Sequence, residues 1–223
     1  MNFFARLQAD TQVERTHLMA SPLVAQALAG QLSSETYVAF LCQAYHHVRH
    51  TVPLLMAAGS RIPGEQEWLR DALAEYVEEE LGHQEWILND IEACGFSREA
   101  ASRSLPNPET ELMVAYAYHV IDRVNPVGFF GMVHVLEGTS ISVADRAADC
   151  IQGSTGLPNK AFSYLRSHGA LDIEHVAFFE NLMNRIDNTE DQRQIIHCAR
   201  IFYRLYAGVY ASVDGVQAQA LAA

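Results

Sequence analysis

Basic residues are scarce in this sequence. Fifteen Lys and Arg side chains stand against 27 Asp and Glu, giving a formal net charge of −12 at pH 7. Nucleic acids and anionic membrane surfaces are bound through basic faces, so this balance argues against both partners. The chain also lacks an uninterrupted apolar run of the roughly 18 residues that cross a membrane, and its start shows no signal-peptide pattern. We therefore expect a soluble, cytoplasmic protein.

Cysteine is sparser still. The four cysteines lie far apart in the sequence and form no CxxC pair. This spacing argues against a thiolate zinc site and against a disulfide framework. We expect the thiols to be small core residues of a protein kept in a reducing compartment: Cys42, Cys94, Cys150 and Cys198.

Alternation of the β-strand type is absent, whereas helical periodicity runs through almost the whole chain. With 223 residues and 49% hydrophobic content, the sequence predicts an all-α fold. The expected architecture is one domain, residues 1–223, folded as a bundle of about seven or eight helices with a frayed tail at 216–223. The expected long helices are 3–18, 33–59 (bent at Pro53), 65–94, 108–124, 126–153, a segment ending near 187, and a last helix that starts with a capping box at Thr189–Gln192.

Histidine and carboxylate side chains recur within these helices. In the stretch SHGALDIEHVAFFENL, His168, Asp172 and His175 have offsets of zero, four and seven, which places them within about 60° of one another on a helix. This pattern is typical of a metal-binding stripe, although a polar helix surface would show it as well.

Three other helices carry residues of the same kind. In EYVEEELGHQEW, Glu80 is three residues and Glu79 four residues before His83. A lone carboxylate, Glu137, follows the apolar run FFGMVHVL, and His47 shares a helical face with Gln43 and His50. Each motif has a purely structural interpretation: a solvated acidic face, a core carboxylate paired with Arg123 or Arg146, or packed histidines, His46 above all. His134, three residues before Glu137, would support a ligand or be structural.

Taken together, the motifs indicate a shared cation. An unpaired carboxylate in a bundle core is costly and would sooner take up a proton. Bundles that present Glu from some helices and Glu-x-x-His from others are known to hold two metals. Imidazole and carboxylate without thiolate suit iron or manganese better than structural zinc.

These motifs resemble those of the haem-oxygenase-like di-iron oxidase and oxygenase family, whose superfamily includes thiaminase II and the pyrroloquinoline-quinone synthase. The resemblance covers nearly the whole chain. It rests on EExGH at residues 79–83, on Glu137 and on HxxxDxxH at residues 168–175. It implies a haem-oxygenase-like bundle that binds two irons per chain (manganese being possible) and uses O2 to oxidise a small organic substrate. It also implies an external electron donor and a homodimer.

The resemblance further assigns the ligands. One iron would be held by Glu80, His83 and His168, and the other would be held or bridged by Asp172, His175 and Glu137. Glu137 and Asp172 are the residues we assign to catalysis. Four residues are candidates for apolar walls of the substrate site, although a simple packing role is favoured for each: Phe129, Phe130, Met132 and Tyr116.

Two points remain open in the sequence. Either Glu79 or Glu80 is the ligand, and the face shared with Tyr76 favours Glu80. Many family members add a carboxylate from the helix that here reads YHHVRH, so His47, or otherwise His46, would replace it, or a single iron would be bound.

The superfamily also offers rival functions. A thiaminase-like hydrolase needs a nucleophilic cysteine near Glu137, but Cys150 is too far along the helix. A haem-binding protein would use His17 as the axial ligand. Two further rivals are a quinone-synthase-like enzyme without metal and a non-catalytic small-molecule-binding protein of the same fold.

Overall fold

The computed structural model describes residues 1–215 and 218, and of residues 168–175 it describes the helical backbone but not the side chains. Most of the expected frayed tail, 216–223, therefore lies outside the described residues. All regular secondary structure in the described part is helical, so the predicted all-α class is confirmed. The helices are α1 (Phe3–Asp10), α2 (Gln12–Met19), α3 (Pro22–Leu28), α4 (Ser34–Val48), α5 (Thr51–Gly59), α6 (Glu67–Glu80), α7 (His83–Ala93), α8 (Arg98–Arg103), α9 (Pro108–His119), α10 (Phe130–Thr155), α11 (Ser163–Arg185) and α12 (Thr189–Ala211).

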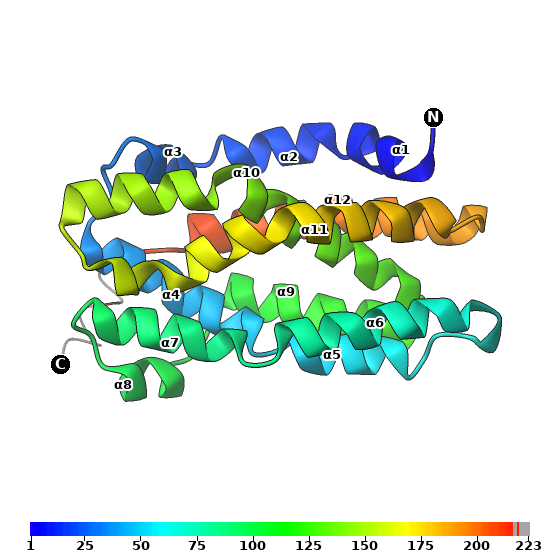
Figure 1. Cartoon of the computed structure of the whole chain (residues 1–223), viewed down its shortest axis with the longest axis horizontal. Coiled ribbons are helices and arrows are strands. Elements are labelled where there is room, and N and C mark those ends of the chain that lie inside the picture. Colours follow the sequence, from blue (N-terminus) through cyan, green and yellow to red (C-terminus); the bar gives the residue numbers. More distant parts are fainter. Residues whose placement is uncertain (216–217, 219–223) are drawn as a thin grey trace.

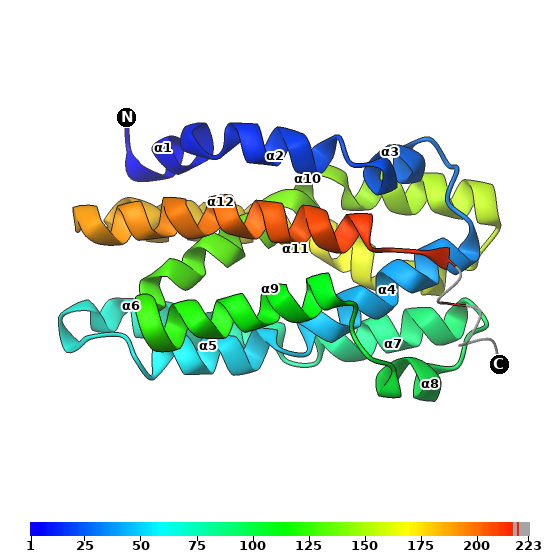
Figure 2. The same cartoon turned by 180° about the vertical axis from the view of Figure 1, so that it is seen from behind.

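Three helices, α10, α11 and α12, form the centre of the bundle. Figures 1 and 2 show α1–α3 along one side of the molecule, α5–α9 along the opposite side, and α11 and α12 between them. The long helix α10 crosses obliquely from one side to the other and packs against both α11 and α12. Different faces of α10 therefore contribute side chains to different parts of the interior.

The bundle has more helices than the seven or eight expected, because three of the expected long helices are interrupted. The first breaks at Thr11, whose hydroxyl donates to the carbonyl of Leu7 at 2.7 Å. The helix expected at 33–59 breaks at His50, so that Pro53 lies in the first turn of α5, where proline is tolerated. The helix expected at 65–94 breaks at Gly82, which has φ +90°.

Close backbone packing fixes the start of α10. A Cβ atom on Gly131 would lie 2.6 Å from the backbone nitrogen of Ala199 and 2.8 Å from the carbonyl oxygen of Ile195. Only glycine therefore allows α10 to approach α12 this closely. The contact sets the position of Glu137, which follows fewer than two turns later on the same helix.

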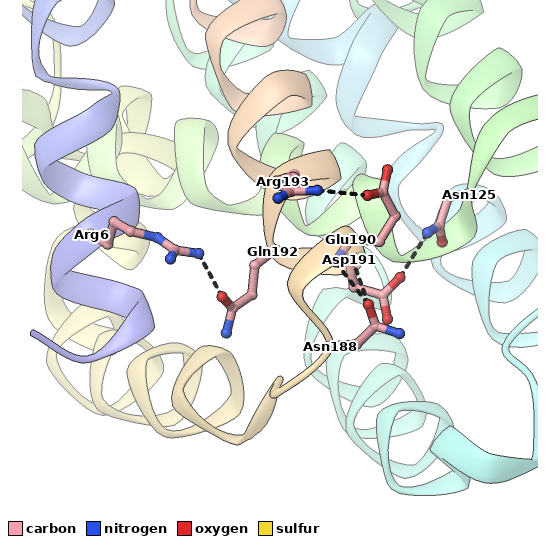
Figure 3. Close-up of polar contacts among 7 residues, drawn as sticks. All are labelled: Arg6, Asn125, Asn188, Glu190, Asp191, Gln192 and Arg193. Atoms are coloured by element: carbon pink, nitrogen blue, oxygen red, sulfur yellow. Dashed lines mark hydrogen bonds and ion pairs between the residues drawn. The ribbon is translucent and has the colours of Figure 1, made fainter.

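The start of α12 is held by a polar cluster (Figure 3). The Asn188 side chain accepts from backbone amides of the first turn, so the cap lies one residue before the expected Thr189–Gln192 box, and that prediction was wrong. Asp191, 7% exposed, accepts from Asn125 at 2.8 Å and from Gln66 at 2.6 Å. These bonds tie α12 to the segment before α10 and to the segment before α6.

One helical stretch of the described chain, Pro126–Thr155, is long and apolar enough to cross a membrane, although the sequence has no uninterrupted apolar run of that length. Of its most apolar 18-residue window, 61% is buried inside the protein. A buried core helix has the same composition, so this is weak evidence for a membrane span.

Candidate metal centre

Glu80 and His83 meet across a helix break. We expected both on one continuous helix, but Glu80 is the last residue of α6 and His83 the first of α7. Leu81 is extended and Gly82 adopts the left-handed conformation that glycine accepts without strain. This turn brings the Glu80 Oε2 atom to 2.9 Å from the His83 Nδ1 atom, and His83 is 3% exposed.

The structure separates the two neighbouring glutamates. Glu79 is exposed, whereas Glu80 is half-buried and faces the interior. Glu80 is therefore better placed than Glu79 to act with His83 at an interior site, and which of the two is a ligand stays a prediction.

Glu80 lines a cavity of about 90 Å³ in the middle of the bundle, which we call the central cavity. Its wall is mostly apolar, with contributions from α4, α5, α6, α10, α11 and α12. No lysine or arginine occurs among the lining residues within the described part of the chain. The polar side chains that line it are His47, Thr51, Tyr76, Glu80, Glu137, Ser140, Tyr164 and Tyr206.

Glu137 enters this cavity from α10 and lies close to Tyr76 of α6. Burial, followed by the negative charge of Glu137, raises the pKa of Tyr76 far above its usual value. Tyr76 is 2% exposed, so it remains a neutral phenol beside the carboxylate. The two arginines considered as partners of Glu137, Arg123 and Arg146, are exposed.

Of the histidines near the end of α4, only His47 lines the central cavity. His46 instead lies 2.9 Å from the Ser104 hydroxyl, and burial, followed by the charge of Arg49, lowers its pKa to about 4. The Nδ1 atom of His50 lies 3.2 Å from the Tyr118 hydroxyl. The expected stripe of Gln43, His47 and His50 therefore does not converge, because α4 ends at Val48.

His134 lies on another face of α10. Its Nε2 atom is 3.4 Å from the Thr11 hydroxyl, and its ring packs against Phe4, Phe179 and Tyr203. It does not line the central cavity.

The remaining expected ligands, His168, Asp172 and His175, belong to α11. Their side chains lie outside the described residues, so their placement stays a prediction. Among the side chains that are described, no three His, Cys, Asp or Glu lie close enough together to hold a metal ion. The expected metal centre therefore stays a prediction, with its remaining donors expected from α11.

The apolar walls agree in part with expectation. Phe129 and Met132 line the central cavity. Phe130 is fully buried elsewhere in the core, and Tyr116 packs edge-on against Phe202. An adjoining cavity, almost entirely apolar, shares Ser140 and two tyrosines of the wall with the central one.

Two tyrosines of the central cavity were missed in the sequence. Tyr206 follows the buried Phe202 by four residues and so lies on the same face of α12, a spacing that could have revealed it. Tyr164 has no such signal, because it precedes the recognisable stripe on α11.

A sequence profile of iron-containing redox enzymes matches residues 38–207 of the chain. The chain belongs to this family. The match spans the segments that carry His47, Glu80, His83 and Glu137, as well as the HxxxDxxH motif. No curated protein sequence matches significantly.

Solved structures show that this member of the family has the haem oxygenase-like fold. A Shewanella denitrificans domain of unknown function with that fold is 23% identical, with a TM-score of 0.84 over 96% of this chain and 92% of the other. A TenA homologue from Pseudomonas syringae is 13% identical (TM-score 0.76; coverage 96% and 93%). Haem oxygenase-1 from Synechocystis, solved in complex with haem, is also 13% identical (TM-score 0.74; coverage 99% and 96%). At these identities the likeness establishes the fold alone.

The candidate residues of two rival functions lie away from the central cavity. His17, the candidate axial ligand for haem, is exposed on α2. Cys150, the candidate nucleophile, is half-buried and does not line the central cavity.

Proposed function

We propose that the chain is a non-haem iron oxidase or oxygenase that uses O2 to oxidise a small organic substrate. The observation that carries this proposal is the convergence on one cavity of Glu80 and Glu137, from two different helices. His47 lines the same cavity, and His83 is joined to Glu80. Membership of a family of iron-containing redox enzymes supports the choice of metal.

The donor atoms fit iron. Glu80 and His83 would each offer iron a donor atom, and the structure holds the Glu80 carboxylate and the His83 ring together at 2.9 Å. Among the described side chains that line the central cavity there is no cysteine, and imidazole with carboxylate is a donor set that suits non-haem iron. Bound ferrous iron would supply electrons and open coordination positions for O2.

Two irons are proposed, following the ligand pattern of the sequence. Glu80, His83 and His168 would hold one, and Asp172, His175 and Glu137 would hold or bridge the other. His47 replaces the carboxylate that many relatives place on this helix, so it belongs to the second site.

The surrounding residues prepare the site. Tyr76 stays protonated beside Glu137, so its hydroxyl is available to donate to that carboxylate and fix its orientation. Phe129 and Met132 give the cavity an apolar wall. A homodimer and an external electron donor complete the proposal.

The decisive measurement is the iron content after anaerobic loading with Fe(II). We expect about two irons per chain in the wild type and a near-ultraviolet or visible band that develops when O2 is admitted. Glu137→Ala, His175→Ala and Glu80→Gln should each bind less iron, and His47→Ala should lose the second iron selectively. Glu79→Gln is the matched control and should load as the wild type does.

Equal iron content in all these proteins would end the proposal. A non-catalytic binding protein of the same fold would instead tolerate His175→Ala without losing its ligand.

A further inference from the structure

A second polar cavity, of about 160 Å³, lies between α1 and α2 on one side and α10, α11 and α12 on the other. We call it the Arg15 cavity. It is separate from the central cavity, and among the described residues only Glu137 lines both. The other polar groups that matter to its chemistry are Gln8, Thr11, Arg15, His134 and Tyr203.

Arg15 is the only basic residue among the described residues that line this cavity. Its guanidinium donates to the Ser142 hydroxyl at 2.8 Å. Within the described part of the chain no carboxylate forms an ion pair with it, whereas the adjacent Glu14 pairs with Arg204 at 3.7 Å. Arg15 is half-buried, so its charge faces the cavity without a counter-ion from those residues.

Tyr203 supplies a second donor from α12. The residue is 1% exposed, and its hydroxyl has no hydrogen-bond partner among the side chains and backbone that the structure describes. A buried hydroxyl favours a hydrogen-bond partner. A ligand oxygen in this cavity would accept a hydrogen bond from it.

The Arg15 guanidinium and the Tyr203 hydroxyl lie close to each other at the wall of this cavity. Burial raises the pKa of Tyr203 to about 12, and the positive charge of Arg15 opposes that rise. Burial, followed by the charge of Arg15, lowers the pKa of His134 to about 4. The guanidinium is thus near both rings, the tyrosine keeps its proton as a donor, and the imidazole stays neutral.

We infer that the Arg15 cavity binds the carboxylate group of a small organic acid, with the Arg15 guanidinium and the Tyr203 hydroxyl as its donors. A carboxylate fits better than a phosphate group, because one guanidinium balances one negative charge and Glu137 adds a second carboxylate to the wall. The rest of the acid points toward Glu137. This last step rests on the proposed function, because it makes the bound acid the substrate of the iron site.

The probe is 4,4,4-trifluorobutyrate, titrated against the full-length protein and followed by ¹⁹F NMR, with 4,4,4-trifluorobutan-1-ol as the neutral analogue. We expect the acid to bind at least ten times more tightly than the alcohol. Arg15→Gln should weaken binding of the acid at least tenfold and leave the alcohol unchanged. Tyr203→Phe, which removes only a hydroxyl and keeps the packed ring, should fold normally and weaken binding of the acid about threefold to tenfold.

Arg204→Gln is the matched control. It removes an arginine that neighbours Tyr203 in sequence but is exposed and paired with Glu14, and it should bind the acid as the wild type does. Crystals soaked in 4-bromobutyrate should show anomalous bromine density in the Arg15 cavity.

Equal binding of acid and alcohol, undiminished binding by Arg15→Gln, or equally tight displacement of the probe by inorganic phosphate would overturn the inference. The titration is run with and without bound Fe(II), and iron content is measured in each variant. Loss of iron binding with retained acid binding would sink only the proposed function, whereas the reverse result would sink only the carboxylate site.

Discussion

His134 shows how burial converts a single side chain into a pH-sensitive element of stability. Burial and the charge of Arg15 lower its pKa from 6.5 to about 4 in the folded protein. Between pH 6.5 and 4, His134 is therefore protonated in the unfolded chain and neutral in the folded protein. The contribution to stability is complete above pH 6.5 and is lost progressively as the pH falls to 4, by up to about 3 kcal/mol.

We therefore expect His134→Asn to flatten the fall in stability between pH 6.5 and 4.5, measured as the free energy of unfolding in urea at several pH values. His17→Asn, at an exposed position, should keep the slope of the wild type. Parallel slopes for wild type and His134→Asn would contradict the assignment.

The sequence was sufficient to predict the types of residue at the candidate site but not which of two neighbours faces inward. Glu79 and Glu80 both lie within one turn of His83, and His46 and His47 are adjacent. A periodicity argument cannot resolve such pairs once a helix ends between the residues being compared. The structure places Glu80 and His47 at the central cavity, and it does so through breaks at Gly82 and after Val48.

At the scale of elements, the fold class and most helix starts followed from the sequence, because caps and apolar stripes are local signals. The breaks within the expected long helices did not follow from the sequence. Gly82 could be read as an ordinary residue inside a long helix, since its role depends on the turn between α6 and α7. Arg15 was not singled out either, because its significance comes from α10 and α12, which pack beside it only in the folded chain.

The turn at Gly82 is testable against a turn of the same kind. Gly82 has φ +90° and Gly95 has φ +88°, and a Cβ atom at either position would meet nothing within 4 Å. Alanine at each should therefore cost the same backbone strain, about 1–2 kcal/mol in the free energy of unfolding. Only Gly82→Ala should also lower the iron content, because it displaces His83 from Glu80. Equal iron content in both variants would show that the turn does not position the site.

For the whole molecule, the fold does not indicate the activity, which has to be inferred from the site. The same architecture is found in a haem oxygenase and in TenA homologues at 11–16% identity, so the bundle alone specifies no activity. The functional argument for this chain therefore rests on the cavities that α10 lines: an apolar one, the central one with Glu80, and the Arg15 cavity. Glu137 lies where the last two meet, so its charge state affects both.

A metal bound at that junction would stabilise the entire bundle, because it would bind the folded chain far better than the unfolded one. Mn(II), which avoids oxidation, should raise the melting temperature. At one hundred times its dissociation constant the gain is about 2.7 kcal/mol, or roughly 5–10 °C for a domain of this size. The ligands bind metal only when deprotonated, so the shift should shrink between pH 7.5 and 5.5. Glu79→Gln should keep the full shift, and Glu80→Gln and His175→Ala should lose most of it. The same shift in all four proteins would mean that Mn(II) binds the acidic surface rather than the interior.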